Sequence, residues 1–175
     1  MIPDDAIEFD TPRLLVRRLH AGDVDAMHAV YGDAGAMRWV GDGEPLSRAA
    51  CEDWVAVSGR NYRLRGYGMF AVTDRATGEV VGFCGLVHPG GQDEAEVKYA
   101  FRRGCWGRGY ASEVVSALLL HGARRHGLRS VIATVAPDNA ASQRVLAKAG
   151  MARGALRDNA DGTRTQLFEW VPPPG

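Results

Sequence analysis

The chain has 175 residues, of which 46% are hydrophobic and 24% are charged, the ordinary composition of a globular protein that buries one core. Its 21 basic and 21 acidic side chains cancel, so the overall charge favours neither nucleic acid nor an anionic membrane as a partner. No apolar run approaches the roughly 20 residues of a membrane span, and the acidic first ten residues lack the order of a signal peptide. We expect a single domain over residues 1–175, in the cytoplasm, where three widely spaced cysteines stay reduced.

The first half of the chain predicts a strand, two helices and a hairpin. Residues 14–19 form an apolar run typical of a strand. Asp23 is a candidate N-cap for a short helix, and a second helix is expected over 47–63 behind an N-terminal serine. Two further apolar runs, 67–72 and 80–87, are joined by a short turn that contains a glycine. Such a pair is typical of an antiparallel hairpin.

The second half alternates strands and helices. In order, we expect a strand, a helix, a strand, a helix and two strands: 95–101, 110–126, 131–135, 139–149, 151–156 and 165–171. The apolar residues of the first of these helices recur at the spacing that gives one buried face. The element order predicts an α/β (α+β) fold with a mixed sheet of about seven strands and about four helices. The proline-rich tail, 172–175, is expected to fray.

A glycine-rich loop connects the strand over 95–101 to the helix over 110–126. Gly104, Gly107 and Gly109 let the backbone turn tightly and approach a ligand closely. The first turn of the helix offers free N–H groups and the positive end of the helix dipole, which suit a phosphate. The loop is neither a P-loop nor a dinucleotide fingerprint, because the residues that those motifs require after the glycines are missing. From glycine spacing alone, a tight turn without a ligand stays open.

Two motifs carry a family resemblance. The first is Trp-Gly-Arg-Gly-Tyr-Ala at residues 106–111, and the second is Asn-Ala-Ala-Ser-Gln-Arg-Val-Leu-Ala-Lys-Ala-Gly-Met at residues 139–151. Together with residues 11–14 and Asp23, they resemble the GCN5-related N-acetyltransferase superfamily, and within it the RimJ/RimL-like branch of ribosomal-protein N-acetyltransferases. Trp106 departs from the general motif of the superfamily but is usual in this branch. The resemblance implies one domain with a mostly antiparallel central sheet that is splayed at an acyl-CoA site.

The resemblance also implies acetyl-CoA as the cosubstrate and indicates which residues bind it. Backbone amides of 106–111 would hold the pyrophosphate, and Ala100 and Phe101 would pair with the pantetheine arm like an added strand. A backbone N–H near Phe101 would bind the thioester oxygen, in the splay between this strand and 131–135. The complete expected cofactor-binding set is Ala100, Phe101, Trp106, Gly107, Arg108, Gly109, Tyr110, Ala111, Asn139, Ser142 and Arg144.

Two residues are predicted to move protons. Glu96 occupies the family position for a base that deprotonates the amine, with a solvated strand residue as the plain alternative. Strand alternation puts Lys98 on the same face, where it would either pair with the carboxylate and lower its basicity or repel a cationic substrate. Ser142 is the candidate proton donor for the leaving thiolate, with a helix residue bonded to backbone as the alternative. Tyr99 is a weaker candidate donor because it faces away from Glu96.

The amine acceptor is open, since a protein N-terminus and a small-molecule amine both fit the sequence. Its contacts are expected from 35–65 and 89–93, the parts least fixed by any motif. The five histidines show no metal-ligand spacing, so no metal is expected. Two alternatives remain: a catalytically idle acyl-CoA sensor, supported by Lys98 beside Glu96, and a transferase for another acyl group such as succinyl. A homodimer is also kept open, without a direct sign of it in the sequence.

Overall fold

One mixed sheet of eight strands organises the computed structural model, which describes residues 7–40 and 43–174. In chain order the strands are β1 (Ile7–Asp10), β2 (Leu14–Arg18), β3 (Met69–Asp74), β4 (Val80–Val87), β5 (Ala95–Phe101), β6 (Val131–Val135), β7 (Ala152–Asp158) and β8 (Arg164–Trp170). Their order across the sheet is β1-β2-β3-β4-β5-β6-β8-β7. All neighbours are antiparallel except β5 and β6, so the predicted mixed, mostly antiparallel α/β fold is confirmed.

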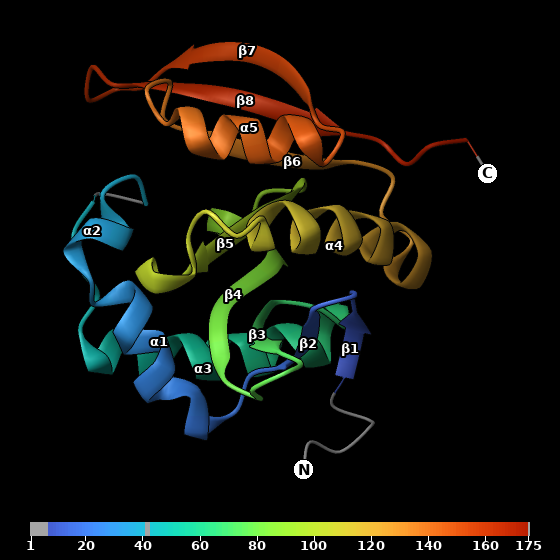
Figure 1. Cartoon of the computed structure of the whole chain (residues 1–175). Helices are drawn as coiled ribbons and strands as arrows, with labels where there is room; N and C mark the ends of the chain where they lie inside the picture. Colours follow the sequence, from blue (N-terminus) through green and yellow to red (C-terminus); the bar gives the residue numbers. More distant parts are fainter. Residues whose placement is uncertain (1–6, 41–42, 175) are drawn as a thin grey trace.

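Helices cover both faces of this sheet (Figure 1). They are α1 (Val24–Tyr31), α2 (Ala34–Met37), α3 (Arg48–Arg65), α4 (Tyr110–His126) and α5 (Ala140–Lys148), with short 3-10 turns η2 (Ala21–Asp23), η3 (Pro89–Gly91) and η4 (Arg103–Cys105). One buried cluster lies mainly beneath α4 and α5, and a second lies beneath α1, α2 and α3. Within the described residues, no helix combines the length and the apolar composition that a membrane crossing requires.

The parallel pair of β5 and β6 is unusually short. Its register contains only Ala95 opposite Val131 and Glu96 opposite Ile132, after which the two strands separate. Figure 1 shows β6, β7, β8 and α5 together in the upper part of the view and the remaining strands below. The sheet therefore divides next to the second half of β5, as the expected splay requires.

The sequence missed two short elements. The additional strand β1 has four residues and pairs with β2 along the sheet edge, and α2 also has four residues. Neither element is long enough for its hydrophobic period to be recognised. The expected frayed tail has no regular structure at 172–174, and residue 175 lies outside the described residues, as do residues 1–6 of the acidic N-terminus.

Helix caps were predicted with mixed success. Ser47 accepts a hydrogen bond from the Ala50 backbone N–H, as an N-cap should. Asp23 occupies the predicted N-cap position of α1, but its side chain makes no capping hydrogen bond to that helix. Its carboxylate instead accepts two hydrogen bonds of 2.8 Å from the Arg17 guanidinium and one from the His20 backbone N–H. A buried bidentate ion pair thus ties β2 to the start of α1.

Replacing this carboxylate should destabilise the fold more than replacing an exposed one. Asp23→Asn leaves the buried Arg17 charge uncompensated, so the free energy of unfolding should fall by about 3 kcal/mol. Asp25→Asn is the matched control, because Asp25 pairs with Arg48 at the surface, and its effect should stay below about 1 kcal/mol. Urea unfolding at neutral pH measures both values.

The stability difference between wild type and Asp23→Asn should change with pH in one direction. Burial would raise the pKa of Asp23, but the hydrogen bonds from Arg17 and His20 outweigh it and leave the pKa lowered. The stabilisation is therefore complete above the unfolded-state pKa of about 3.9 and is lost as the pH falls through the lower folded-state pKa. The stability gap between wild type and Asp23→Asn should be constant near neutrality and shrink in acid. A gap that widened below about pH 4 would contradict this assignment.

Candidate functional site

A cleft of about 1740 Å³ opens where β5 and β6 separate. Its lining comes from the second half of β5, the loop that precedes α4, the first turn of α4, the end of β6 and the start of α5. The opposite side is formed by α2, α3 and the end of β4. Residues 35–65 and 89–93, expected to contact the acceptor, contribute to that side; residues 41 and 42 lie outside the described residues. The cleft therefore has one side built from the predicted motifs and one side built from the least constrained segments.

The glycine-rich loop gives the cleft a backbone surface. Gly107 and Gly109 have φ values of 78° and 79°, which favour glycine because a side chain is strained there. Helix α4 begins directly afterwards, and the Glu113 N–H makes its bond to the Gly109 carbonyl. By helix geometry the N–H groups of residues 110–112 have no acceptor within the helix. They form an electropositive group of donors at the edge of the cleft.

The register of β5 decides which backbone groups face the opening. The Arg102 N–H donates to the Val81 carbonyl of the β4 side, so the alternation of an antiparallel pair also directs the N–H and C=O of Ala100 to β4. The corresponding groups of Tyr99 and Phe101 point to the opposite side, where β6 has moved away. The Trp106 indole N–H donates to the Phe101 carbonyl at 2.9 Å, which leaves the Phe101 N–H as a donor facing the cleft.

Glu96 and Lys98 form an ion pair at the base of the cleft. The Lys98 Nζ lies 3.0 Å from a Glu96 carboxylate oxygen, as their shared strand face predicts. Glu96 is buried, whereas the Lys98 side chain is 43% exposed. Of the two, only Lys98 lines the cleft. The ammonium group thus lies between the carboxylate and the opening.

The structure joins Tyr99 to Ser142. The two hydroxyl oxygens are 2.5 Å apart, and both residues line the cleft. Tyr99 faces away from Glu96, as predicted, but that face is the one next to α5. Burial raises the pKa of Tyr99 to about 12, although the hydrogen bond with Ser142 lowers it, so the phenol keeps its proton at neutral pH. Asn139 accepts a hydrogen bond from the Ser142 N–H, which confirms its role as N-cap of α5.

A polar clamp that the sequence did not reveal holds the cofactor loop. The Arg13 guanidinium bonds a Glu113 carboxylate oxygen at 2.7 Å and the Arg108 carbonyl at 2.8 Å. Thr11 donates to the other Glu113 oxygen, and Arg13 also lies 4.5 Å over the Tyr110 ring. The only advance sign was that these residues fall within the motifs of residues 11–14 and 106–113. The residues that lead into β2 thereby hold the loop and the first turn of α4 in one position.

Two expected cofactor residues lie apart from the cleft. Arg108 is exposed and contributes its carbonyl to the clamp, and its side chain is not part of the cleft lining within the described residues. Arg144 lines a separate pocket of about 550 Å³ between α5 and the strands β7 and β8. The remaining nine members of the set line the cleft: Ala100, Phe101, Trp106, Gly107, Gly109, Tyr110, Ala111, Asn139 and Ser142.

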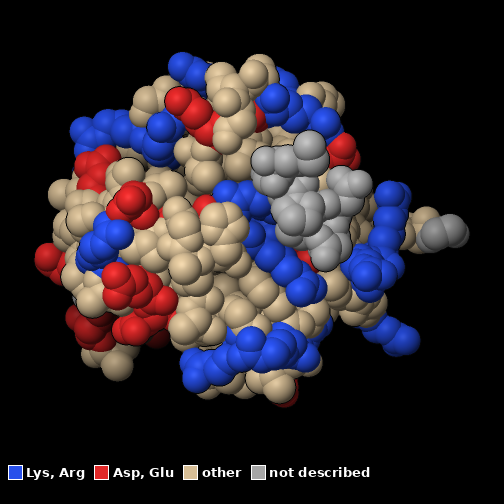
Figure 2. Space-filling view, turned by 90° about the horizontal axis from the view of Figure 1, so that it is seen from below, with Lys and Arg blue, Asp and Glu red and all other residues tan. Residues whose placement is uncertain are grey.

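Charge around the cleft is uneven although the chain is neutral overall. The described residues that line it include five cationic side chains, Arg38, Arg65, Lys98, Arg103 and Arg164, and a single carboxylate, Asp161. Of these cations, Lys98 pairs with Glu96, Arg103 with Asp33 and Arg164 with Asp158. Charge is also unevenly spread on the face of the molecule seen in Figure 2, where basic side chains run across the middle and along the lower edge and acidic ones gather mainly at the left.

The family model of the acetyltransferase (GNAT) domain matches residues 13–152, which include Arg13 and Glu113 of the clamp, the glycine loop and the Ser142 helix. The chain belongs to this family. It is an enzyme of the N-acetyltransferase class, and the resemblance to the RimJ/RimL-like branch holds at the level of the fold.

Three similar proteins illustrate this membership. The Bacillus subtilis protein YkkB, described as uncharacterized, is 36% identical over 101 residues, which make up 57% of this chain and 59% of that protein. The uncharacterized N-acetyltransferase YnaD of the same organism is 29% identical over 143 residues, 82% of this chain and 81% of its own length. The solved structure of RimL, a ribosomal L7/L12 alpha-N-protein acetyltransferase in complex with coenzyme A, has a TM-score of 0.81 at 19% identity, covering 94% of this chain and 97% of that one.

Proposed function

We propose that this GNAT enzyme transfers an acetyl group from acetyl-CoA to a primary amine by direct attack in a ternary complex. One observation carries the proposal: the unpaired edge of β5 and the free N–H groups of α4 border the same cleft. An added strand suits the first feature, and a pyrophosphate suits the second. That RimL was solved with coenzyme A supports the same choice of donor.

The backbone assigns a position to each part of the donor. The N–H groups of residues 106–111 would bind the pyrophosphate, held in place by the clamp from Arg13. The pantetheine amides would pair with the backbone of Tyr99 and Phe101, since the Ala100 groups are bonded to β4. The thioester oxygen would accept from the Phe101 N–H. This hydrogen bond would strengthen as the oxygen gains negative charge in the transition state.

Attack and departure require two proton transfers. The neutral amine nitrogen bonds to the thioester carbonyl carbon and releases its surplus proton to water in the cleft, the C–S bond breaks, and the thiolate sulfur takes a proton. Ser142 is the proposed donor of that proton, and the Tyr99 hydroxyl 2.5 Å away would replace it. Because the pKa of Tyr99 is raised, the pair enters each turnover protonated at neutral pH.

Glu96 is the proposed base for the acceptor ammonium, and its use depends on Lys98. While the Lys98 Nζ stays 3.0 Å from the carboxylate, an incoming ammonium is repelled and the carboxylate is screened. An acceptor that carries an acidic group would attract the Lys98 ammonium and release Glu96. We therefore place an amine with a nearby carboxylate or phosphate ahead of a polyamine as substrate, in agreement with the cationic lining. A protein N-terminus with an acidic residue close behind it meets this description, and the RimL acceptor type supports it.

The direct test measures release of free thiol from acetyl-CoA in the presence of paired acceptors. One pair consists of N-terminal peptides that differ only in Glu against Lys at the second position, and another of an amino dicarboxylate and its diamide. Thiol release should depend on the amine, with kcat/KM at least about tenfold higher for the acidic member. No release with any amine, together with no heat of binding for acetyl-CoA, would refute the proposed function. Equal rates for both members would refute only the acceptor class.

Removing hydroxyls of the Tyr99–Ser142 pair should lower the rate of the chemical step. Ser142→Ala is expected to reduce kcat by about 100-fold with little change in the Kd for acetyl-CoA. Because Tyr99 and Ser142 act as one unit, adding Tyr99→Phe should cost little beyond the more harmful single change. Ser116→Ala, which removes a hydroxyl bonded to backbone within α4, is the matched control and should behave like wild type. Multiplicative losses in the double variant would argue against a shared proton.

A catalytically idle acyl-CoA sensor is the second candidate, favoured by the ion pair that occupies Glu96. For an active enzyme, Glu96→Gln should lower kcat by about 100-fold, whereas Lys98→Met should raise the rate on cationic amines and lower it on acidic ones. Glu94→Gln, an exposed neighbour, is the control. Tight CoA binding without turnover, unchanged by Glu96→Gln, would favour the sensor. Substituting succinyl-CoA as the donor in the same assay tests whether Lys98 selects an acidic acyl group instead.

A further inference from the structure

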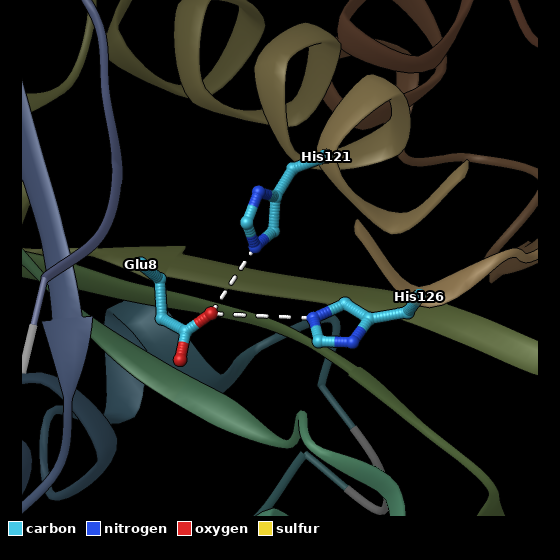
Figure 3. Close-up of side chains that lie close together, drawn as sticks. All are labelled: Glu8, His121 and His126. Carbon is cyan, nitrogen blue, oxygen red and sulfur yellow. Dashed lines mark hydrogen bonds and ion pairs between the residues drawn. The ribbon is translucent and has the colours of Figure 1, made fainter. Parts of the chain in front are cut away.

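Three side chains converge at the other end of α4, away from the cleft (Figure 3). Glu8 comes from β1, and His121 and His126 come from the last turns of α4. The Glu8 Oε2 lies 3.1 Å from the His121 Nε2 and 4.0 Å from the His126 Nε2. Their three ligand-type atoms all lie within 4.8 Å of one another, and the side chains are only 10–14% exposed.

The two oxygens of the Glu8 carboxylate have different partners. Its Oε1 accepts a hydrogen bond of 2.9 Å from the Arg18 Nε, and Arg18 itself stacks on the Tyr62 ring. This contact fixes the plane of the carboxylate and leaves Oε2 directed at the two imidazoles. Because the Arg18 charge is held at Oε1, it does not occupy the position between Oε2 and the rings.

His126 distinguishes this cluster from an ordinary carboxylate–imidazole pair. Its Nε2 is buried, and within the described residues no hydrogen-bond partner satisfies it. A buried polar atom without a partner costs free energy, so its retention in this position calls for a ligand.

We infer that Glu8, His121 and His126 form a three-ligand site for a divalent transition-metal ion of the zinc class. Two imidazole nitrogens and one carboxylate oxygen are a donor set that zinc accepts, with water in the fourth position. Tetrahedral ligands about 2.0–2.1 Å from the ion lie about 3.4 Å apart. The two distances from the Glu8 Oε2, 3.1 and 4.0 Å, bracket this value, and all three atoms lie within 4.8 Å of one another, so a small inward shift of the side chains would complete the coordination.

A metal ion at this site would stabilise the fold and would take no part in acetyl transfer. None of its three residues lines the cleft, and the cofactor loop is at the opposite end of α4. A bound ion would link the edge strand β1 to the C-terminal turns of α4, two elements 113 residues apart in the chain at Glu8 and His121. Metal binding would then stabilise the fold by mass action, by an amount that rises with the logarithm of the free ion concentration above the Kd.

The test uses the full-length chain without a histidine tag, freed of metal with a chelator. Zinc chloride titrated by calorimetry near neutral pH should bind with one ion per chain and raise the melting temperature. His121→Gln and His126→Gln should each weaken binding by at least about tenfold. The matched control His28→Gln replaces an exposed histidine of α1 and should bind like wild type. Cobalt(II) in the same protein should show the intense visible absorption of a tetrahedral site.

Two results would overturn the inference: no binding by wild type, or equal affinity in wild type and His126→Gln. If a histidine variant unfolds, Glu8→Gln supplies the second test, because it keeps the side-chain volume and removes only the anionic ligand. Its zinc affinity should fall as well, and an unchanged affinity would count against the site. Acetyl transfer by the wild type is measured separately, so failure of this inference leaves the proposed function untouched.

Discussion

The separation of β6 from β5 after two paired residues is the constraint on which the site depends. Until Glu96 and Ile132 the strands share a parallel ladder, and beyond that point β5 has a partner only in β4. An unpaired strand edge inside a protein carries backbone groups that need partners. Here the edge faces a cleft, so a ligand can supply them. The fold thus creates a binding edge by leaving a sheet incomplete.

The rest of the chain holds that edge in place from both sides. On one side Arg13 and Thr11 bind Glu113 and fix the loop that leads into α4. On the other, Asn139 caps α5 and holds Ser142 against Tyr99. The motifs are far apart in sequence because each belongs to a different wall of the cleft. Their spacing reflects the length of the intervening α4 and β6.

Charged side chains are concentrated around the cleft. Lys98 of β5 pairs with the buried Glu96, and four arginines also line the cleft. Family membership fixes the class of reaction, whereas these side chains determine which acceptors the cleft tolerates. The proposed preference for an acidic acceptor follows from this local charge, which the zero net charge of the chain conceals.

Sequence reasoning succeeded where one element carried the whole signal. The apolar stripe of α4, the Ser47 and Asn139 caps and the hairpin of β3 and β4 are local patterns, and each was predicted. It failed where the partner was distant. The Asp23 side chain was expected to bond the backbone of α1, but its partner is Arg17 of the preceding strand.

The same limit applied to chemistry. Tyr99 was placed on the correct face, but nothing in the chain order revealed Ser142 on the other side of it. The two histidines of the proposed metal site, His121 and His126, showed no metal-ligand spacing in the sequence, and its third member, Glu8, lies on a strand too short to predict. Contacts between elements depend on how the sheet is assembled, and single-sequence patterns do not encode that assembly.

The most direct measurement is amide hydrogen exchange at single residues of β5, followed by NMR with and without acetyl-CoA and no acceptor. If the thioester arm pairs with the open edge of the strand, exchange at Phe101 should slow by about tenfold or more. Ala100, whose N–H is already bonded to β4, should change little and serves as the internal reference. Slowing confined to the pocket near Arg144, with Phe101 unchanged, would contradict the account.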